Sequence, residues 1–312
     1  MTAAVEASDR ARGAAGDVAV VVVSHQTRDE AVRCLRSADE AGASELVLVD
    51  NGSTDGTAAA VRGAVPRARV LELDNAGFAR GANAGVRATR APVVVVANAD
   101  VRFAADALEI LGRQVLDDPR VAAAGPLVTY PDGSPQASAR RLPDPLTAVG
   151  HALLGRLVPH NRFTRHYRAL DVDPARARDV DWLSGCAIAL RREALDEVDG
   201  FDPAYFLYVE DVDLGLRLRD AGWRLRYEPG ARVRHRVGAS TSRRRMRSLI
   251  HHARGLDRFY GAHLASTWPR RAARPLLRLA LAAWVATSLV GERLERRLGL
   301  QRSTTGEQGV AA

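Results

Sequence analysis

The sequence contains no lysine, and all 45 of its basic residues are arginine. A P-loop of the G-x-x-x-x-G-K-S/T type is therefore impossible, because its phosphate-binding lysine is missing. The net charge of +8 reflects this arginine bias, which is typical of a composition preference, so it is weak evidence for a nucleic-acid partner. The two cysteines, Cys34 and Cys186, are too few for a disulfide framework or a metal quartet. We expect both thiols to be reduced in a cytoplasmic chain.

Long apolar segments are missing as well. The first seventeen residues contain no apolar run of the kind found in signal peptides, so we expect no export. The nearest candidate for a membrane span covers residues 279–291, and this run is shorter than the roughly 20 residues that a bilayer requires. Residues 1–16 and 301–312 are aperiodic, and we expect both to be disordered tails. The chain as a whole is 46% hydrophobic, which is enough to bury a core.

Four short aliphatic runs open the folded part, at residues 18–23, 45–49, 70–73 and 93–97. Continuous runs of this kind are typical of strands that are buried on both faces. Helical patterns lie between them, so we predict βαβ units and a mostly parallel central sheet, which is the α/β class. Ligands of such sheets bind beyond the carboxyl ends of the strands.

The helix after the first run should begin with a capping box, in which Thr27 and Glu30 bond to the backbone of the first turn. We predict one nucleotide-binding domain over residues 17–240 and a basic helical extension over residues 241–300. Residues 150–180 are basic and poorly periodic, and we expect a mobile loop or insertion there. Further helices are predicted over residues 79–90, 104–117, 191–198 and 212–221, and further strands over 121–145, 182–190, 224–227 and 233–235.

Polar motifs follow the predicted strands. The first strand ends in Ser24 without a glycine cluster, which excludes a G-x-G-x-x-G dinucleotide loop. The later motifs are VDNGSTDGT at 49–57, NAGFARGAN at 75–83, NAD at 98–100, WLSGC at 182–186 and EDVDL at 210–214, followed by a lone His235. In this order they resemble the inverting family 2 glycosyltransferases of the GT-A fold, in their bacterial rhamnosyltransferase-like branch. The resemblance covers about residues 17–240.

The resemblance implies a donor site at these strand ends. Asp50 corresponds to the family's acceptor for the ring N–H of the nucleotide's pyrimidine base. Arg80 would lie at a helix N-terminus that faces the strand ends, a position suited to a diphosphate. Gly77 would allow the backbone to approach the ligand closely. The full set that we expect to bind the nucleotide sugar is Ser24, Asp50, Asn75, Gly77, Arg80, Asn83, Asn98 and Gly185.

The resemblance also implies a metal site and a catalytic base. Asp100 would bind a divalent cation, Mg²⁺ or Mn²⁺, that bridges the donor diphosphate, and in several relatives the position of His235 ligates this metal. Asn98 replaces the first Asp of the family's D-x-D-like motif, so the affinity for the metal rests on fewer negatively charged side chains. Asp211 corresponds to the base that takes the proton of the acceptor hydroxyl. We expect Glu210, Asp213 and Trp182 to orient this base or to contact the acceptor.

The predicted function is an inverting transfer of a sugar, rhamnose or a similar hexose, from a nucleoside-diphosphate sugar to a hydroxyl of a lipid-linked cell-envelope glycan. Two alternatives remain at this point. A sugar-1-phosphate nucleotidyltransferase shares the strand–helix alternation, although its glycine-rich loop and lysines are absent. A non-catalytic basic binding module would fit the high pI, but the arginine-rich part lacks the interleaved aromatics of a nucleic-acid interface. We expect no nucleic-acid partner.

The apolar run at residues 279–291 has arginines on both sides. It is either a helix that packs on the domain or an interfacial helix, with its apolar side in the lipid boundary and its arginines on anionic head groups. A lipid-linked acceptor favours the second interpretation. We therefore expect a peripheral protein on the cytoplasmic face of the cell membrane.

Overall fold

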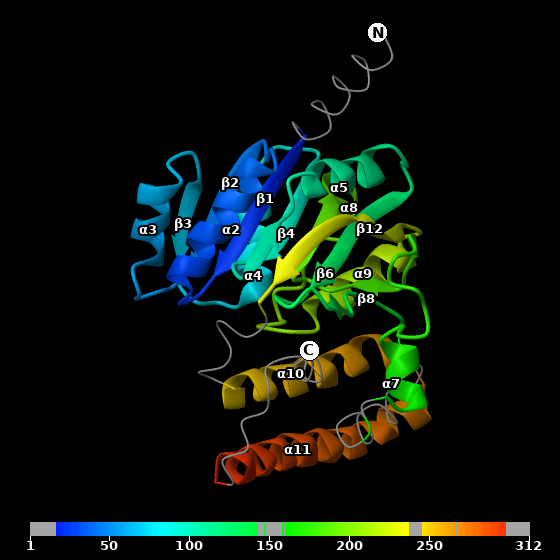
Figure 1. Cartoon of the computed structure of the whole chain (residues 1–312). Helices are drawn as coiled ribbons and strands as arrows, with labels where there is room; N and C mark the ends of the chain where they lie inside the picture. Colours follow the sequence, from blue (N-terminus) through cyan, green and yellow to red (C-terminus); the bar gives the residue numbers. More distant parts are fainter. Residues whose placement is uncertain are drawn as a thin grey trace.

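The computed structural model describes residues 17–142, 147, 158, 160–236, 245–265 and 267–297. Residues 17–236 contain an α/β domain, and residues 245–297 add two long helices beside it (Figure 1). The two predicted tails and the predicted boundary near residue 240 lie outside the described residues.

One large sheet organises the domain, and its strands lie in the order β3-β2-β1-β4-β11-β6-β12-β5. The predicted α/β class is confirmed, since β1 pairs in parallel with β2 and β4, and β2 pairs in parallel with β3. The other half is mixed: β11 is antiparallel to β4 and β6, whereas β12 is parallel to β6. The strand bounds are β1 (Val18–Ser24), β2 (Glu45–Asn51), β3 (Arg69–Leu73), β4 (Val93–Asn98), β5 (Val101–Phe103), β6 (Val121–Thr129), β11 (Ala187–Arg191) and β12 (Arg224–His235).

Helices cover both faces of the sheet, so the strands between them are buried on both sides (Figure 1). Alternate residues of β1 belong to two different core clusters, with Val20 on one face and Val21 on the other. This explains why the strands appear in the sequence as unbroken aliphatic runs. One face carries α2 (Arg28–Glu40), α3 (Thr57–Ala64) and α5 (Ala107–Leu116), and the other carries α4 (Phe78–Arg87), α8 (Arg192–Glu197) and α9 (Glu210–Asp220).

Two local predictions need correction. The capping box at the start of α2 is wrong: the Thr27 hydroxyl bonds to the Ser24 hydroxyl (2.7 Å), and no side-chain bond caps this helix within the described part. Glu30 pairs with arginines instead, because a charge-assisted bond to a guanidinium is stronger than a bond to a backbone amide. The stretch at 150–180, expected to be a loop, contains α7 (Arg162–Tyr167) and β9 (Arg178–Asp179) among its described residues.

Short strands connect the loop region to the domain. β7 (Pro135–Gln136) pairs with β6, and β8 (Ala139–Arg140) forms a two-stranded sheet with β10 (Trp182–Leu183). β10 leads directly into the WLSGC motif, so this small sheet positions the motif at the edge of the main sheet.

The C-terminal helices are α10 (Arg245–Phe259), a short π-helical turn η2 (Tyr260–Leu264) and α11 (Trp268–Arg297), and α10 and α11 run side by side (Figure 1). Asp257 of α10 joins them through ion pairs with Arg274 and Arg278 of α11, at 2.9 and 3.0 Å. The bonds from these two arginines lower the pKa of Asp257 to about 2, so the link stays ionised over the whole physiological range.

Candidate active site

Asp50 lies at the carboxyl end of β2, level with Ser24 at the end of β1. The side chain is buried, and its Oδ1 accepts a hydrogen bond from the backbone N–H of Ser53 (3.0 Å). Within the described chain, the other carboxylate oxygen receives no hydrogen bond. Asp50 therefore combines the turn bond expected of this motif with an oxygen that can accept a bond from a nucleobase N–H.

The loop after β3 is held by a hydrogen bond within the loop and by hydrogen bonds to two distant segments. Asn75 accepts a bond from the N–H of Gly77 (3.3 Å), and the amide of Asn51 donates to the Gly77 carbonyl (3.0 Å). The N–H of Phe78 donates to the carbonyl of Phe206 (2.7 Å). Gly77 has φ +96°, and a Cβ there would overlap the Phe206 backbone. A close approach of the protein's own chain therefore requires this glycine, and the approach of a ligand stays a prediction.

Arg80 and Asn83 of α4 both face the segment at residues 201–206. The Arg80 side chain is exposed and lies 3.5 Å from the Pro203 carbonyl, so it remains able to reach a diphosphate. The amide of Asn83 bonds twice to the backbone of Phe201, donating to its carbonyl (2.7 Å) and accepting from its N–H (2.9 Å). Asn83 therefore ties α4 to this segment, and its contact with the nucleotide stays a prediction.

Asp100 and His235 form the candidate metal site. The Oδ1 atom of Asp100 lies 3.1 Å from Nε2 of His235, and both side chains are buried. The Nδ1 atom of His235 lies 3.1 Å from Oε1 of Gln136, a carbonyl oxygen that can only accept, so Nδ1 carries the proton. Burial alone lowers the pKa of His235, but the charge of Asp100 and the hydrogen bond to it raise the pKa to about 10.

The donor set fits a divalent cation that is shared with a ligand. A carboxylate oxygen and an imidazole nitrogen suit Mn²⁺, and the carboxylate suits Mg²⁺. Over the described residues, no group of three or more His, Cys, Asp or Glu side chains could enclose a metal by itself. Asp100 and His235 thus leave most coordination positions to phosphate oxygens and water, as expected for a cation that binds together with a diphosphate.

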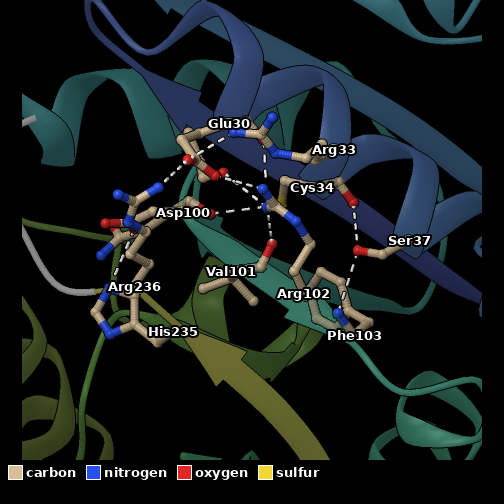
Figure 2. A network of polar contacts seen from close by, with 12 residues as sticks. Glu30, Arg33, Cys34, Ser37, Asp100, Val101, Arg102, Phe103, His235 and Arg236 are labelled. Atoms are coloured by element: carbon tan, nitrogen blue, oxygen red, sulfur yellow. Dashed lines mark hydrogen bonds and ion pairs between the residues drawn. The ribbon is translucent and has the colours of Figure 1, made fainter. Parts of the chain in front are cut away.

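A network of charged side chains supports the Asn98-Ala99-Asp100 motif from the side of α2 (Figure 2). Glu30 of α2 pairs with Arg102, and also with Arg236 at 3.4 Å. Arg102 donates to the carbonyl of Val101 (2.6 Å), and the N–H of Arg236 donates to the carbonyl of Asp100 (3.0 Å). Glu30 thereby fixes the backbone on both sides of the metal site. Sequence analysis missed this role, because it assigned Glu30 to a helix cap.

Asp211 lies in the first turn of α9 and faces the WLSGC motif. Its Oδ2 accepts a hydrogen bond from the N–H of Gly185 (2.8 Å), and its Oδ1 accepts one from the N–H of Val212 (2.9 Å). Burial raises the pKa of the Asp211 carboxyl, while the bond from Gly185 and the charge of Arg140 lower it. The result is a carboxylate of fixed orientation that is more basic than a solvated aspartate, which suits a general base.

Glu210 and the turn before it are under strain. Glu210 is buried, its Oε2 has no hydrogen-bond partner in the described structure, and burial together with the Asp211 charge raises its pKa to about 8. Tyr208 and Val209 both adopt left-handed backbone conformations, with φ of 69° and 71°. Gly255 of α10 packs against this turn, where an added Cβ would lie 3.1 Å from the Tyr208 carbonyl. Two consecutive non-glycine residues of this kind are typical of functional sites, and no local sequence pattern indicates them.

Asp213 and Trp182 have structural contacts that the predicted acceptor role did not include. Both carboxylate oxygens of Asp213 are engaged: Oδ1 with His263 (2.7 Å) and the Tyr205 hydroxyl (3.2 Å), and Oδ2 with Arg217 (2.7 Å). Trp182 is 3% exposed and packs beneath α9, so its ring cannot reach an acceptor. Asp213 instead ties α9 to the C-terminal extension, and Trp182 supports the helix that carries Asp211.

The predicted residues lie in one row along the carboxyl edge of the sheet. Ser24 pairs with Asp50 across β1 and β2, and Asn98 ends the neighbouring strand β4. The N–H of Asn98 donates to the carbonyl of Cys186 (2.9 Å), which places the Gly185 turn beside the NAD motif. The N–H of Gly185 then bonds to Asp211. The row therefore extends from Asp50, the candidate nucleobase-binding residue, to Asp211, the candidate general base.

Replacing Gly77 by alanine tests the contact between the loops. We expect a loss of stability of about 2 to 4 kcal/mol, because the new Cβ must displace the Phe206 backbone at an already unfavourable φ. Gly133→Ala is the matched control: its φ is +86°, but nothing lies within 4 Å of its Cβ position. Urea denaturation measures both variants, and equal losses would show that the Phe206 contact has no energetic role.

Comparisons with known proteins show the family and the fold of this chain. Residues 15–255 match the model of the "Glycosyltransferase like family 2" family. The N-acetylglucosaminyl-diphospho-decaprenol L-rhamnosyltransferase of Mycobacterium tuberculosis is 38% identical over 249 residues, which are 76% of this chain and 80% of the relative. Two solved structures share the fold: a Pyrobaculum calidifontis mannosyltransferase with GDP-Man and Mn²⁺ (TM-score 0.55, 19% identity, 88% of this chain and 75% of that one), and GalNAc-T7 with UDP, GalNAc and Mn²⁺ (TM-score 0.56, 16% identity, 84% and 51%).

Proposed function

This chain belongs to the family 2 glycosyltransferases, and from that premise we propose that it transfers rhamnose from a nucleoside-diphosphate sugar to a lipid-linked glycan. Family membership also resolves the two alternatives left open by the sequence, since neither a nucleotidyltransferase nor a binding module belongs to this family. The relative from M. tuberculosis, whose name contains both the rhamnosyl group and a decaprenol diphosphate, supports the finer assignment. The row from Asp50 to Asp211 is the observation that carries the proposal.

The residues from Asp50 to Asp100 in this row act on the donor. The free oxygen of Asp50 accepts a bond from the nucleobase, and the guanidinium of Arg80 approaches the diphosphate from the start of α4. Asp100 and His235 would hold the divalent cation, which supplies Lewis-acid stabilisation of the leaving nucleoside diphosphate. We assign the metal as Mg²⁺ or Mn²⁺, on the basis of the donor set.

Asp211 acts on the acceptor. Its carboxylate takes the proton of the acceptor hydroxyl as the oxygen attacks the anomeric carbon, and the N–H of Gly185 keeps the carboxylate oriented for this step. A single displacement from the face opposite the leaving diphosphate inverts the anomeric centre. Glu210 and Asp213 do not need to contact substrate in this scheme, because Glu210 is buried and Asp213 anchors the helix that carries the base.

A donor panel tests the function. Purified protein with Mg²⁺ or Mn²⁺ is offered dTDP-, UDP- and GDP-sugars together with an N-acetylglucosaminyl-diphospho-prenol, and the product is identified by mass spectrometry and NMR. We expect transfer from dTDP-L-rhamnose, with inversion at its anomeric carbon. Transfer of another sugar would overturn the donor assignment, and a retained anomeric configuration would overturn the mechanism.

We further propose that α11 brings the enzyme to the membrane surface. No helix in the described part of the chain has both the length and the apolarity needed to cross a bilayer. The inner side of α11 is joined to α10, but its outer side exposes apolar residues over several turns, including Trp268 (79%), Leu276 (69%) and Leu279 (68%). Arg274 and Arg278 pair with Asp257, which corrects the expectation that all flanking arginines face lipid head groups.

Liposome co-sedimentation tests this proposal. Because an exposed apolar helix face with flanking arginines partitions into anionic interfaces, we expect the protein to pellet with anionic vesicles and much less with neutral ones. The double variant Leu276→Asp/Leu279→Asp should stay in the supernatant. Leu73→Asp/Leu170→Asp, which changes two exposed leucines of the α/β domain, should pellet like wild type. Equal pelleting of both double variants would refute the membrane role of α11.

A further inference from the structure

Two neighbouring arginines, of which Arg140 acts on the candidate base, are not explained by donor binding. Arg140 ends β8, where it pairs in register with Trp182 of β10, and β10 leads to Gly185 and so to Asp211. Arg168 follows α7 and reaches the same place through the bond from the N–H of Arg141 to the carbonyl of Tyr167 (3.2 Å). The two guanidinium groups are therefore brought together by neighbouring segments, on the side of the row that contains the base.

The environments of the two arginines differ. Arg140 is 4% exposed, donates from Nε to the Ala137 carbonyl (2.9 Å), and lies over the rings of Trp182 and Tyr167 at 5.0 and 5.6 Å. These contacts fix its position. Arg168 is not satisfied in this way: among the residues that the structure describes, nothing accepts a hydrogen bond from its buried Nε and Nη2 atoms.

The electrostatics of the cluster favour an anion. Burial and the charge of Arg140 lower the pKa of Arg168 to about 10, and the group nevertheless remains charged at neutral pH. Burial raises the pKa of the Tyr130 phenol, and the charges of both arginines act against this shift. Two neighbouring cations, one of them with buried donors that lack acceptors, form an arrangement that a phosphate can complete, because guanidinium donors match phosphate oxygens.

We propose that Arg140 and Arg168 bind a phosphate group of the acceptor. This inference rests on the proposed function and specifies the acceptor further. The acceptor is a phosphate-bearing carrier, which the enzyme recognises through its charge as well as through its sugar. The candidate donor site lies at Asp50 and Asp100, whereas the charge of Arg140 acts on Asp211, the group that meets the acceptor. Arg168 donates hydrogen bonds to the phosphate, and Arg140 provides the second positive charge beside it.

Binding of inorganic pyrophosphate provides the first test, since it does not depend on catalysis. In EDTA, which removes the divalent cation through which pyrophosphate could bind at Asp100 and His235, we expect pyrophosphate to raise the Tm of wild type and of Arg165→Gln. Arg165 is an exposed arginine of α7 and serves as the matched control. The Tm of Arg168→Gln should not respond. An equal response of Arg168→Gln and wild type, or no response of wild type, would overturn the proposal.

The second test uses two acceptors that carry the same sugar, one on a prenyl diphosphate and one on a neutral alkyl chain. In Arg168→Gln we expect KM for the diphosphate acceptor to rise by about 10-fold or more, with KM for the donor and kcat/KM for the neutral acceptor close to wild type. A purely structural role would impair both acceptors equally, and a role in donor binding would raise the donor KM. Either result would overturn the proposal.

The two tests separate this inference from the proposed function. Wild type that binds pyrophosphate through Arg168 but transfers no rhamnose would refute the donor assignment and support the anion site. Rhamnose transfer by wild type, together with an Arg168→Gln variant that behaves like wild type in both tests, would support the donor assignment and refute the anion site. If Arg168→Gln fails to fold, Arg168→Lys retains the charge without the planar fork, and we expect it to recover only part of the preference for the diphosphate acceptor.

Discussion

Replacing Asp211 by asparagine is expected to lower the rate of sugar transfer by at least about 10²-fold while donor affinity stays near wild type. Asparagine retains the shape of the side chain and can still accept the bond from Gly185, so the loss isolates the proton transfer. Single-turnover kinetics measure the transfer, and a thermal-shift titration with the donor measures the binding.

The pH dependence adds a second readout for Asp211. Its pKa is raised above the ordinary value of 3.8, and the base works only when it is ionised. Therefore kcat/KM of wild type should increase with pH through this raised pKa, and the acidic limb should lie above that of a solvated aspartate. The limb should disappear in Asp211→Asn.

Asp213→Asn is the natural control, because it changes the same side chain on the same helix. It should affect stability more than chemistry, since Asp213 is paired with Arg217 and His263. A thermal melt together with the single-turnover rate separates the two effects. Turnover retained by Asp211→Asn, or a larger loss of the chemical step in Asp213→Asn, would assign the base elsewhere.

Removal of the metal site should have an effect of similar size. In Asp100→Ala we expect loss of metal-dependent donor binding and a fall in turnover of about 10²-fold or more, because the leaving diphosphate loses its counter-charge. His235→Ala should cost less, about 10- to 100-fold, since the negatively charged ligand Asp100 remains. EDTA should reproduce the Asp100→Ala result in wild type.

The control for the metal prediction is Asp106→Ala, which removes an exposed carboxylate close to Asp100 in the chain. This variant should bind donor and metal like wild type. Full activity of wild type in EDTA would instead show that arginines neutralise the leaving group, and Arg80 would be the first residue to examine.

The framework of the fold and the positions of the main carboxylates could be predicted from local patterns. Valine-rich runs indicate strands that are covered on both faces, and polar residues at their ends must gather at one edge. This reasoning placed Asp50 and Asp100 at that edge, whereas Asp211, in the first turn of α9, was assigned through the resemblance. Their roles came from the resemblance, because spacing alone does not distinguish a turn carboxylate from a ligand.

The supporting residues could not be predicted, because each acts through a partner that is distant in the chain. Glu30 meets Arg236 across 206 positions, and Asn83 meets Phe201 across 118. The left-handed backbone of Tyr208 and Val209 lies against α10, a contact that no local propensity encodes. Trp182 was expected to orient the base or to contact the acceptor, and its place beneath α9 can be identified only after the topology is known.

The bond between Phe78 and Phe206 joins the loop after β3 to the segment that leads into the strained turn before α9. Because Gly77 permits this close approach, neither loop can move far without the other. We therefore expect the binding of the donor and the binding of the acceptor to be coupled. Occupancy of the nucleotide site should change the dissociation constant of the acceptor, and by thermodynamic reciprocity the acceptor should change that of the donor by the same factor.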